Sequence, residues 1–169
     1  MIFTTVLILL IAERIYELRL AKRNTQKILE IGGIEFGRNH YWVMIALHSL
    51  FFFSLLLESI LRGVHPPFIW FYLLLVFIAV QYMRAWIIKS MNGRWTTRVL
   101  VIPNETLVSK GPFRYFSHPN YWVVAIEILI FPMIFGLYYT AILFTLLNAM
   151  VILFIRLPVE KKALKLAHH

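Results

Sequence analysis

Long apolar stretches separated by charged connectors constrain this sequence more than any other feature. The chain is 60% hydrophobic, with a mean hydropathy of +0.74. A helix of about 20 residues crosses the ~30 Å of hydrocarbon in a bilayer, and a chain in lipid must satisfy its backbone polar groups internally. Five stretches come close to that length: 2–22, 41–61, 68–89, 119–135 and 137–156. The sequence therefore predicts an all-α integral membrane protein with about five transmembrane helices, forming a single domain over residues 1–169.

The basic residues predict how these helices are oriented. Of the seventeen Lys and Arg, six lie at 14–38, six at 84–114 and four at 156–165, which leaves only Arg62 for the opposite side. Because cytosolic loops are enriched in Lys and Arg, we expect the N-terminus outside and the C-terminus in the cytosol. The charge follows the connectors and forms no basic surface interleaved with aromatic residues, so the expected surroundings are membrane lipids, with no nucleic-acid partner.

Two residue types are missing from the sequence. It contains no Cys, which excludes disulfides, thiolate zinc sites and a cysteine nucleophile. It also contains no Asp, so carboxylate chemistry must come from the eight Glu. A magnesium site built from several carboxylates is unfavourable in such a chain, and we expect no metal site.

The longest polar connector spans 89–117. Within it, the pieces 99–102 and 107–108 are rich in β-branched and aliphatic residues and flank a turn at 103–106. This pattern predicts a small hairpin between the two pieces.

The segment 111–121, GPFRYFSHPNY, is polar, cationic and aromatic and precedes an apolar stretch. Proline is tolerated in the first turn of a helix, so Pro119 predicts a helix start, and His118 would then simply sit near its N-cap. The functional alternative is a site for an anionic or polar group, formed by helix-start N–H groups and the imidazole and flanked by Arg114. Both interpretations stay open, and the segment is the first candidate for the edge of an active site.

Two charged residues fall within apolar stretches. Glu127 lies seven residues after Asn120 and shares its helix face, where a carboxylate is costly unless it faces a polar cavity or makes a structural hydrogen bond. Arg84 lies near the cytosolic end of the third stretch, where it either functions or extends its guanidinium to the membrane interface.

The tail and the second stretch hold further polar candidates. Arg156 and Glu160 are four residues apart and form either a surface ion pair or part of a site, and Pro158 between them argues against a regular helix. His48 and Glu58 are expected to be structural.

The segment 111–121, together with Glu127, Arg156 and Glu160, resembles the isoprenylcysteine carboxyl methyltransferase family. Further similarity to the small bacterial branch of that family extends over almost the whole chain, at 17–24, 32–33, 37–41 and 93–98. The His-Pro core by itself also resembles phospholipid methyltransferases and membrane sterol reductases. In two places the chain departs from the family pattern. Ser117 stands where the family usually has Arg, and Lys161 stands where it usually has a second glutamate.

The resemblance implies a methyltransferase of the bacterial cytoplasmic membrane that binds S-adenosylmethionine from the cytosol. Its cofactor pocket would be formed by the last two helices, the preceding cytosolic loop and the tail. The acceptor would be a lipophilic molecule with a carboxyl or hydroxyl group, resembling an isoprenylcysteine or a long-chain polyketide or pyrone. No oligomeric state is implied.

The resemblance also implies roles for individual residues. The implied cofactor-binding residues are Arg114, Tyr115, His118, Pro119, Asn120, Tyr121 and Glu160. Arg156 would anchor a carboxylate of cofactor or substrate, and Glu127 or His118 would take a proton from a hydroxyl acceptor; a carboxylate acceptor needs no base. Arg84, Trp95 and Arg98 are placed on the substrate side.

Two other functions remain open at this point. An NADPH-dependent reductase of the sterol-reductase type would use the same kind of pocket, with extra basic residues for the ribose phosphate. A non-catalytic membrane scaffold would use the polar segments only as anchors. Cofactor binding separates all three.

Overall fold

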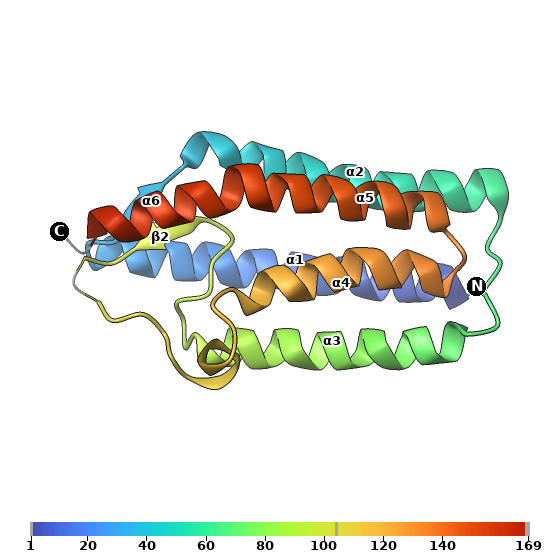
Figure 1. Cartoon of the computed structure of the whole chain (residues 1–169), viewed down its shortest axis with the longest axis horizontal. Helices are drawn as coiled ribbons and strands as arrows, with labels where there is room; N and C mark the ends of the chain where they lie inside the picture. The colour runs from blue at the N-terminus through green and yellow to red at the C-terminus, as the bar shows by residue number, and fades with distance from the viewer. Residues whose placement is uncertain (1, 104, 168–169) are drawn as a thin grey trace.

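The computed structural model describes residues 2–103 and 105–167 and confirms the all-helical class over that part of the chain. The elements in chain order are α1 (Ile2–Glu30), β1 (Ile34–Phe36), η1 (Arg38–His40), α2 (Tyr41–Arg62), α3 (Trp70–Ser90), β2 (Val99–Val101), η2 (Gly111–Arg114), α4 (Pro119–Ile134), α5 (Tyr138–Val151), η3 (Ile152–Arg156) and α6 (Leu157–Ala167). The five longest helices lie along one axis in alternating directions (Figure 1).

Length and composition separate these helices into groups. Three helical stretches in the described residues are long and apolar enough to cross a membrane: Arg38–Arg62, Trp70–Ser90 and Tyr138–Leu166. Helix α4 is apolar but has only 16 residues. Helix α1 carries charged residues in its middle, among them Glu13, Arg14 and Glu17. The protein is therefore a helical membrane protein, and the count of five spans and their orientation stay predictions.

The polar connectors meet at one end of the molecule, which we call the polar end. The β1 region, the connector between α3 and α4, and α6 lie there, whereas the α2–α3 and α4–α5 turns lie at the opposite end with the N-terminus (Figure 1). This grouping follows directly from the alternating helix directions. It matches the division of connectors that the basic residues predicted.

The main core lies toward the other end, which we call the closed end. Aromatic rings from five helices and the α4–α5 turn form its centre: Phe3, Phe51, Phe77, Phe131, Phe135 and Phe144. Edge-to-face contacts such as Phe51 with Phe144, 5.6 Å between centroids, fix these rings against one another. Packing of this kind defines helix positions in lipid, where apolar surfaces alone give little preference for protein over bilayer.

The α4–α5 turn is held by the loop after α2. The His65 N–H donates to the Phe135 carbonyl at 3.1 Å. Gly136 has φ +74°, and a Cβ there would lie 2.2 Å from the His65 carbonyl oxygen. Only glycine combines that backbone conformation with so close an approach. The α4–α5 turn and the loop after α2 are therefore in direct backbone contact at the closed end.

The predicted hairpin between 99–102 and 107–108 is wrong. Strand β2 pairs antiparallel with β1, with Leu100 opposite Glu35, and Leu107 lies in irregular structure, 60% exposed. The turn predicted at 103–106 includes Asn104, which lies outside the described residues. The pairing with β1 also brings Arg98 to Glu35, with Nη1 2.9 Å from Oε1. Charge and backbone pairing thus both favour the distant partner strand.

The chain also stays helical through Pro158, against expectation. Residues Ile152–Arg156 form a π-helical turn, and α6 begins at Leu157. Pro158 therefore stands at the second position of α6, near a helix start, where its missing N–H costs least.

Candidate active site

A cavity of about 360 Å³ lies between α1, α2 and α4 and reaches the polar end. Its apolar wall comes mainly from α1 and α2, for example Leu10, Ile11, Met44 and Phe52. Its polar groups come from several elements: Arg14, Glu17, Tyr41, His48, Arg84, Thr97, Asn120, Tyr121, Glu127 and Arg156. The volume is in the range of small-molecule sites.

The first two helices were not expected in this wall. The resemblance implied a pocket made by the last two helices, the preceding loop and the tail. Helix α4, the connector at Trp95 and the end of the predicted stretch 137–156, at Ile152 and Arg156, do line the cavity, whereas no described residue of α6 does. We therefore describe the site as a cavity between the N-terminal helices and α4.

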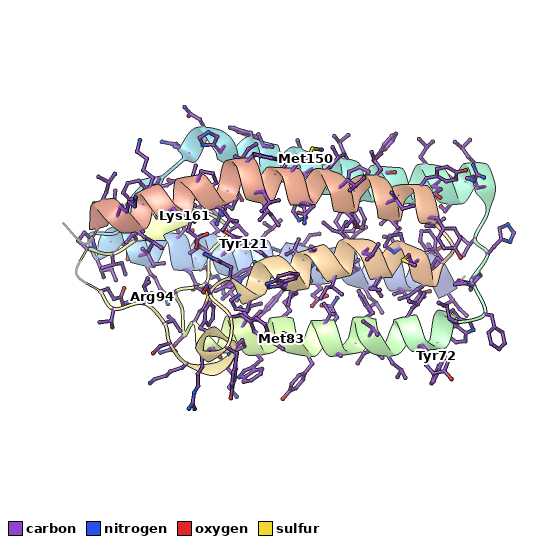
Figure 2. All side chains as sticks on the ribbon, in the orientation of Figure 1. Tyr72, Met83, Arg94, Tyr121, Met150 and Lys161 are labelled. Atoms are coloured by element: carbon purple, nitrogen blue, oxygen red, sulfur yellow. The ribbon has the colours of Figure 1, made fainter. Side chains whose placement is uncertain are left out.

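Four side chains meet at the polar end and form what we call the tail cluster: His118, Tyr121, Arg156 and Glu160. The Tyr121 hydroxyl donates to Glu160, and Arg156 Nε donates to the Tyr121 oxygen at 3.3 Å. The His118 ring stacks on the Tyr121 ring, with centroids 5.2 Å apart, and its Nδ1 lies 3.6 Å from Glu160 Oε1. Figure 2 shows Tyr121 at the start of α4, on the side facing the C-terminal helix.

Tyr121 therefore stands between Arg156 and Glu160. No direct ion pair joins these two residues among the described contacts; Arg156 Nη1 instead donates to the Thr97 carbonyl at 3.0 Å. The surface ion pair considered from their spacing is thus not what the structure has. The tail, the connector and the start of α4 are tied together by this hydrogen-bonded group.

A second group, the charge cluster, lies deeper along the helices and consists of Arg14, Glu17, Arg84 and Glu127. Arg84 donates to Glu127 through Nη2 and to Glu17 Oε2 at 3.3 Å through Nη1. Arg14 Nη1 lies 2.7 Å from Glu17 Oε2, and its Nη2 lies 3.3 Å from Glu127 Oε1. The two guanidiniums and two carboxylates of the cluster balance in charge, as buried ionic groups require. The more exposed Glu13 also contacts Arg14, with its Oε2 3.3 Å from Arg14 Nη2.

This arrangement changes the interpretation of Arg84. Its side chain is 4% exposed and is held by carboxylates from α1 and α4, so it does not extend to the membrane interface. Glu127 is likewise engaged: besides the two arginines, Gln81 Nε2 donates to it at 2.8 Å. Both oxygens of Glu127 are therefore engaged by side chains of the neighbouring helices, which favours a role in positioning those helices.

The other predicted site residues fall into two groups. Trp95 and Asn120 line the cavity with Tyr121 and Arg156, and Pro119 is buried at the start of α4. By contrast, Arg114 and Tyr115 are exposed on the η2 turn and do not line the cavity. Arg98 pairs with Glu35 and lies over the Tyr41 ring, 5.0 Å from its centroid, so it reaches the cavity only through Tyr41.

Sequence reasoning missed Arg14 and Glu17 as site residues. Their spacing of three places both on one face of α1, and this face was recognised only as amphipathic. His48 was expected to be structural; its Nδ1 is bonded to the Met44 carbonyl at 2.8 Å, and its side chain also lines the cavity. A charged pair within an apolar helix was the available signal for Arg14 and Glu17.

Fold and site together define a helical membrane protein with a ligand-sized cavity that is apolar on one side and polar at one end. The chain belongs to the isoprenylcysteine carboxyl methyltransferase (ICMT) family, whose model matches residues 72–166. This family membership suggests a membrane methyltransferase. The matched region includes α4 and the tail cluster; Arg14 and Glu17 precede it.

Two relatives extend the comparison. YpbQ of Bacillus subtilis (strain 168), described as uncharacterized, is 40% identical over 163 residues, which cover 96% of each chain. An uncharacterized protein of Haemophilus influenzae (strain ATCC 51907 / DSM 11121 / KW20 / Rd) is 23% identical over 121 residues, 72% of this chain and 70% of that protein. No solved structure matches.

Proposed function

We propose that this protein is an S-adenosylmethionine-dependent methyltransferase that O-methylates a carboxyl or hydroxyl group of a lipophilic acceptor at the cytosolic membrane face. The observation that carries the proposal is the cavity, which joins an apolar wall on α1 and α2 to the polar residues at the start of α4. A lipid tail and a polar cofactor have opposite requirements, and this one space offers both.

The residues at the polar end suit the cofactor. S-adenosylmethionine carries an amino group, a carboxylate, ribose hydroxyls and an adenine, and it supplies a methyl group on a positively charged sulfur. Asn120 Oδ1 is buried without a hydrogen-bond partner among the described residues, so it has an acceptor free for a cofactor N–H or O–H. Arg156 lines the cavity and supplies a cation for the carboxylate. Glu160 does not line the cavity but adjoins it through its hydrogen bond with Tyr121, and there it would supply an acceptor for amino or hydroxyl groups at the edge of the site.

Pro119 and Tyr121, also at the polar end, would help to place the cofactor. Pro119 fixes the start of α4, which places Asn120 and Tyr121 on the cavity wall. The Tyr121 ring offers a π face near the cavity, where a sulfonium would be attracted as other cations are. Arg114 and Tyr115 are exposed away from this wall, and we leave them out of the proposed cofactor site.

The acceptor would occupy the apolar side. Ile15, Leu18 and Ile45 line the cavity and are also 37–50% exposed on the outer surface, so the cavity opens between α1 and α2. An opening lined by apolar side chains is suited to a lipid tail from the bilayer. Trp95 is buried at the other side of the space and would limit how far the acceptor advances.

Positioning would provide most of the rate enhancement. Methyl transfer to oxygen is an in-line displacement, and holding the two reactants at attack distance is worth up to about 7–11 kcal/mol. The charge cluster would contribute by fixing α1, α3 and α4 around the cavity, and we assign Glu127 this positioning role in place of proton removal.

The test is cofactor binding followed by product analysis. Calorimetry on the detergent-purified protein should show binding of S-adenosylmethionine and none of NADPH. The variant Glu160→Gln should bind S-adenosylmethionine about tenfold more weakly, because it loses a charged acceptor. Glu105→Gln is the matched control, since Glu105 pairs with Arg94 outside the cavity.

Product chemistry then identifies the acceptor group. With a donor labelled in its methyl group, a methyl ester releases labelled methanol on mild base treatment, whereas a methyl ether keeps the label. N-acetyl-S-farnesylcysteine and a long-chain alkylphenol serve as the two acceptors. Binding of NADPH alone would instead favour a reductase, and binding of neither cofactor would favour a scaffold.

A further inference from the structure

Hydrogen-bond donors are left over in the charge cluster. Arg14 Nε, Arg14 Nη2 and Arg84 Nε are buried and have no hydrogen-bond partner among the described residues. Arg14 Nη2 lies 3.3 Å from Glu127 Oε1 and also 3.3 Å from Glu13 Oε2, but neither ion-pair contact has hydrogen-bond geometry. In contrast, no carboxylate oxygen of Glu17 or Glu127 is among the buried atoms that lack a partner in the described residues. The buried atoms of the cluster that lack a partner are therefore all donors.

Arg14 is the member of the cluster that is least enclosed. Its side chain is 16% exposed, compared with 4% for Arg84 and 8% for each of the two glutamates. It also lines the cavity beside the apolar residues Ile11 and Ile15 of the same helix. Arg84 is held on two sides by carboxylates, so Arg14 has more freedom to turn a guanidinium edge toward a ligand.

The two ends of the cavity are thus opposite in hydrogen-bonding character. At the start of α4, the unpaired atom is the acceptor Asn120 Oδ1, whereas beside Arg14 the unpaired atoms are mainly donors, with Gln81 Oε1 as the exception. Asn120 and Glu127 are seven residues apart on α4, which separates the two ends by about 10 Å. The end at the start of α4 suits a ligand group that donates a hydrogen bond, whereas the end beside Arg14 suits an anionic ligand group.

We infer that Arg14 binds the anionic head group of the methyl acceptor, so that the acceptor enters as a carboxylate or as the conjugate base of an acidic hydroxyl. This inference rests on the proposed function and specifies its substrate class. The acceptor oxygen supplies the electron pair of the new O–C bond, and the sulfur keeps the pair of the broken C–S bond. The acceptor leaves neutral, and no proton is removed in the step.

This assignment also explains why no base is needed near the acceptor. Glu127 is occupied by Arg84, Arg14 and Gln81, and His48 is bonded to a backbone carbonyl. With the head group already ionised, the site needs a cation to hold it. The product, which has lost its charge, is held less tightly by the guanidinium and is released more easily.

The experiment compares two probes that share one tail. N-acetyl-S-farnesylcysteine carries a carboxylate, and its methyl ester is neutral. Binding of each to the detergent-purified protein is measured by calorimetry, without turnover. We expect the wild type to prefer the carboxylate and Arg14→Gln to weaken carboxylate binding by about tenfold or more, with ester binding unchanged. Arg14→Lys should retain part of the preference.

Two additional variants keep the test decisive. Arg19→Gln removes an exposed arginine from the same helix and should leave both probes unaffected. The double variant Arg14→Gln/Glu17→Gln removes one positive and one negative charge, so the charge cluster stays neutral. It replaces the single variant in the binding measurement if Arg14→Gln alone folds poorly. Equal binding of the two probes by the wild type, or an unchanged preference in the double variant, would overturn the inference.

The outcome is separable from that of the proposed function. If S-adenosylmethionine binds and methyl transfer occurs while Arg14→Gln keeps the carboxylate preference, only the role of Arg14 fails. If the wild type transfers no methyl group, the proposed function fails, whatever the probes show.

Discussion

Glu58 and Glu127 are both glutamates buried in apolar helices, 8% and 6% exposed, yet their surroundings differ. Glu58, at the closed end, accepts hydrogen bonds from the backbone N–H groups of Tyr139 and Thr140 at 3.2 and 2.7 Å. Glu127 accepts only from side chains in its recorded contacts and lines the cavity. Burial in an apolar helix therefore does not by itself distinguish a structural carboxylate from one at a site.

The difference lies in the partners. The first N–H groups of a helix have no intrahelical acceptor, and Glu58 supplies one for the start of α5, so that contact is complete without a ligand. The charge cluster has donors left over beside a cavity, so it is incomplete without one. The expected structural role of Glu58 agrees with its contacts.

The largest expected effect comes from breaking the charge cluster. Arg84→Met leaves Glu17 and Glu127 short of positive charge in a buried position, and we expect the free energy of unfolding to fall by about 3–5 kcal/mol. Denaturant unfolding in detergent, followed by circular dichroism, measures this. The control Arg62→Met removes an exposed arginine that lies over Tyr139, and should cost less than about 1 kcal/mol. Equal losses of unfolding free energy in Arg84→Met and Arg62→Met would mean that the charge cluster contributes no more to stability than an exposed arginine does.

The closed end should be most sensitive at Gly136. Gly136→Ala places a Cβ against the His65 carbonyl and requires a positive φ, so we expect a loss of about 2–3 kcal/mol in unfolding free energy. Gly32→Ala is the matched control, because Gly32 also has a positive φ of +89° but nothing within 4 Å of the added atom. It should cost about 1 kcal/mol. A similar loss at both positions would show that backbone strain, and not the close approach, limits Gly136.

Hydropathy and charge were sufficient to predict the five long helices and which connectors share an end, but not the continuation of the helix through Pro158 into α6. They could not predict the pairing of β1 with β2, because two long helices separate these strands in sequence and only the folded arrangement brings them together. Of the motif around His118, Asn120 and Tyr121 line the cavity, whereas His118 stacks on Tyr121. Arg114 and Tyr115 were predicted as cofactor residues from the family resemblance, but both are exposed at the η2 turn and do not line the cavity.

The charge cluster shows a second limit. Its members come from α1, α3 and α4, and whether they meet depends on how each helix is rotated about its axis. A sequence gives the spacing within a helix but not that rotation. Arg84 and Glu127 could be singled out as charges in apolar stretches, whereas their partnership with Arg14 and Glu17 required the structure.

Glu58 tests the comparison directly. Glu58→Gln weakens the acceptors for the start of α5, and we expect a loss of about 1–2 kcal/mol in unfolding free energy with unchanged binding of S-adenosylmethionine and of the farnesyl probes. Glu127→Gln should reduce stability and also alter carboxylate binding, because the charge balance around Arg14 changes. Calorimetry on both variants measures this difference. Altered probe binding in Glu58→Gln would contradict the division between the two ends.

The smallest expected effect concerns the two-stranded sheet formed by β1 and β2 at the polar end. Glu35 pairs with Arg98, whose side chain is 34% exposed, and partly exposed pairs of this kind contribute at most about 1 kcal/mol. Glu35→Gln should therefore lower the unfolding free energy by about 0.5 kcal/mol and leave S-adenosylmethionine affinity unchanged. Arg98 also lies over Tyr41, which lines the cavity, so a released Arg98 could displace that ring. A marked loss of S-adenosylmethionine affinity in Glu35→Gln would show that the β1–β2 sheet shapes the site. The substrate-side role predicted for Arg98 would then regain support.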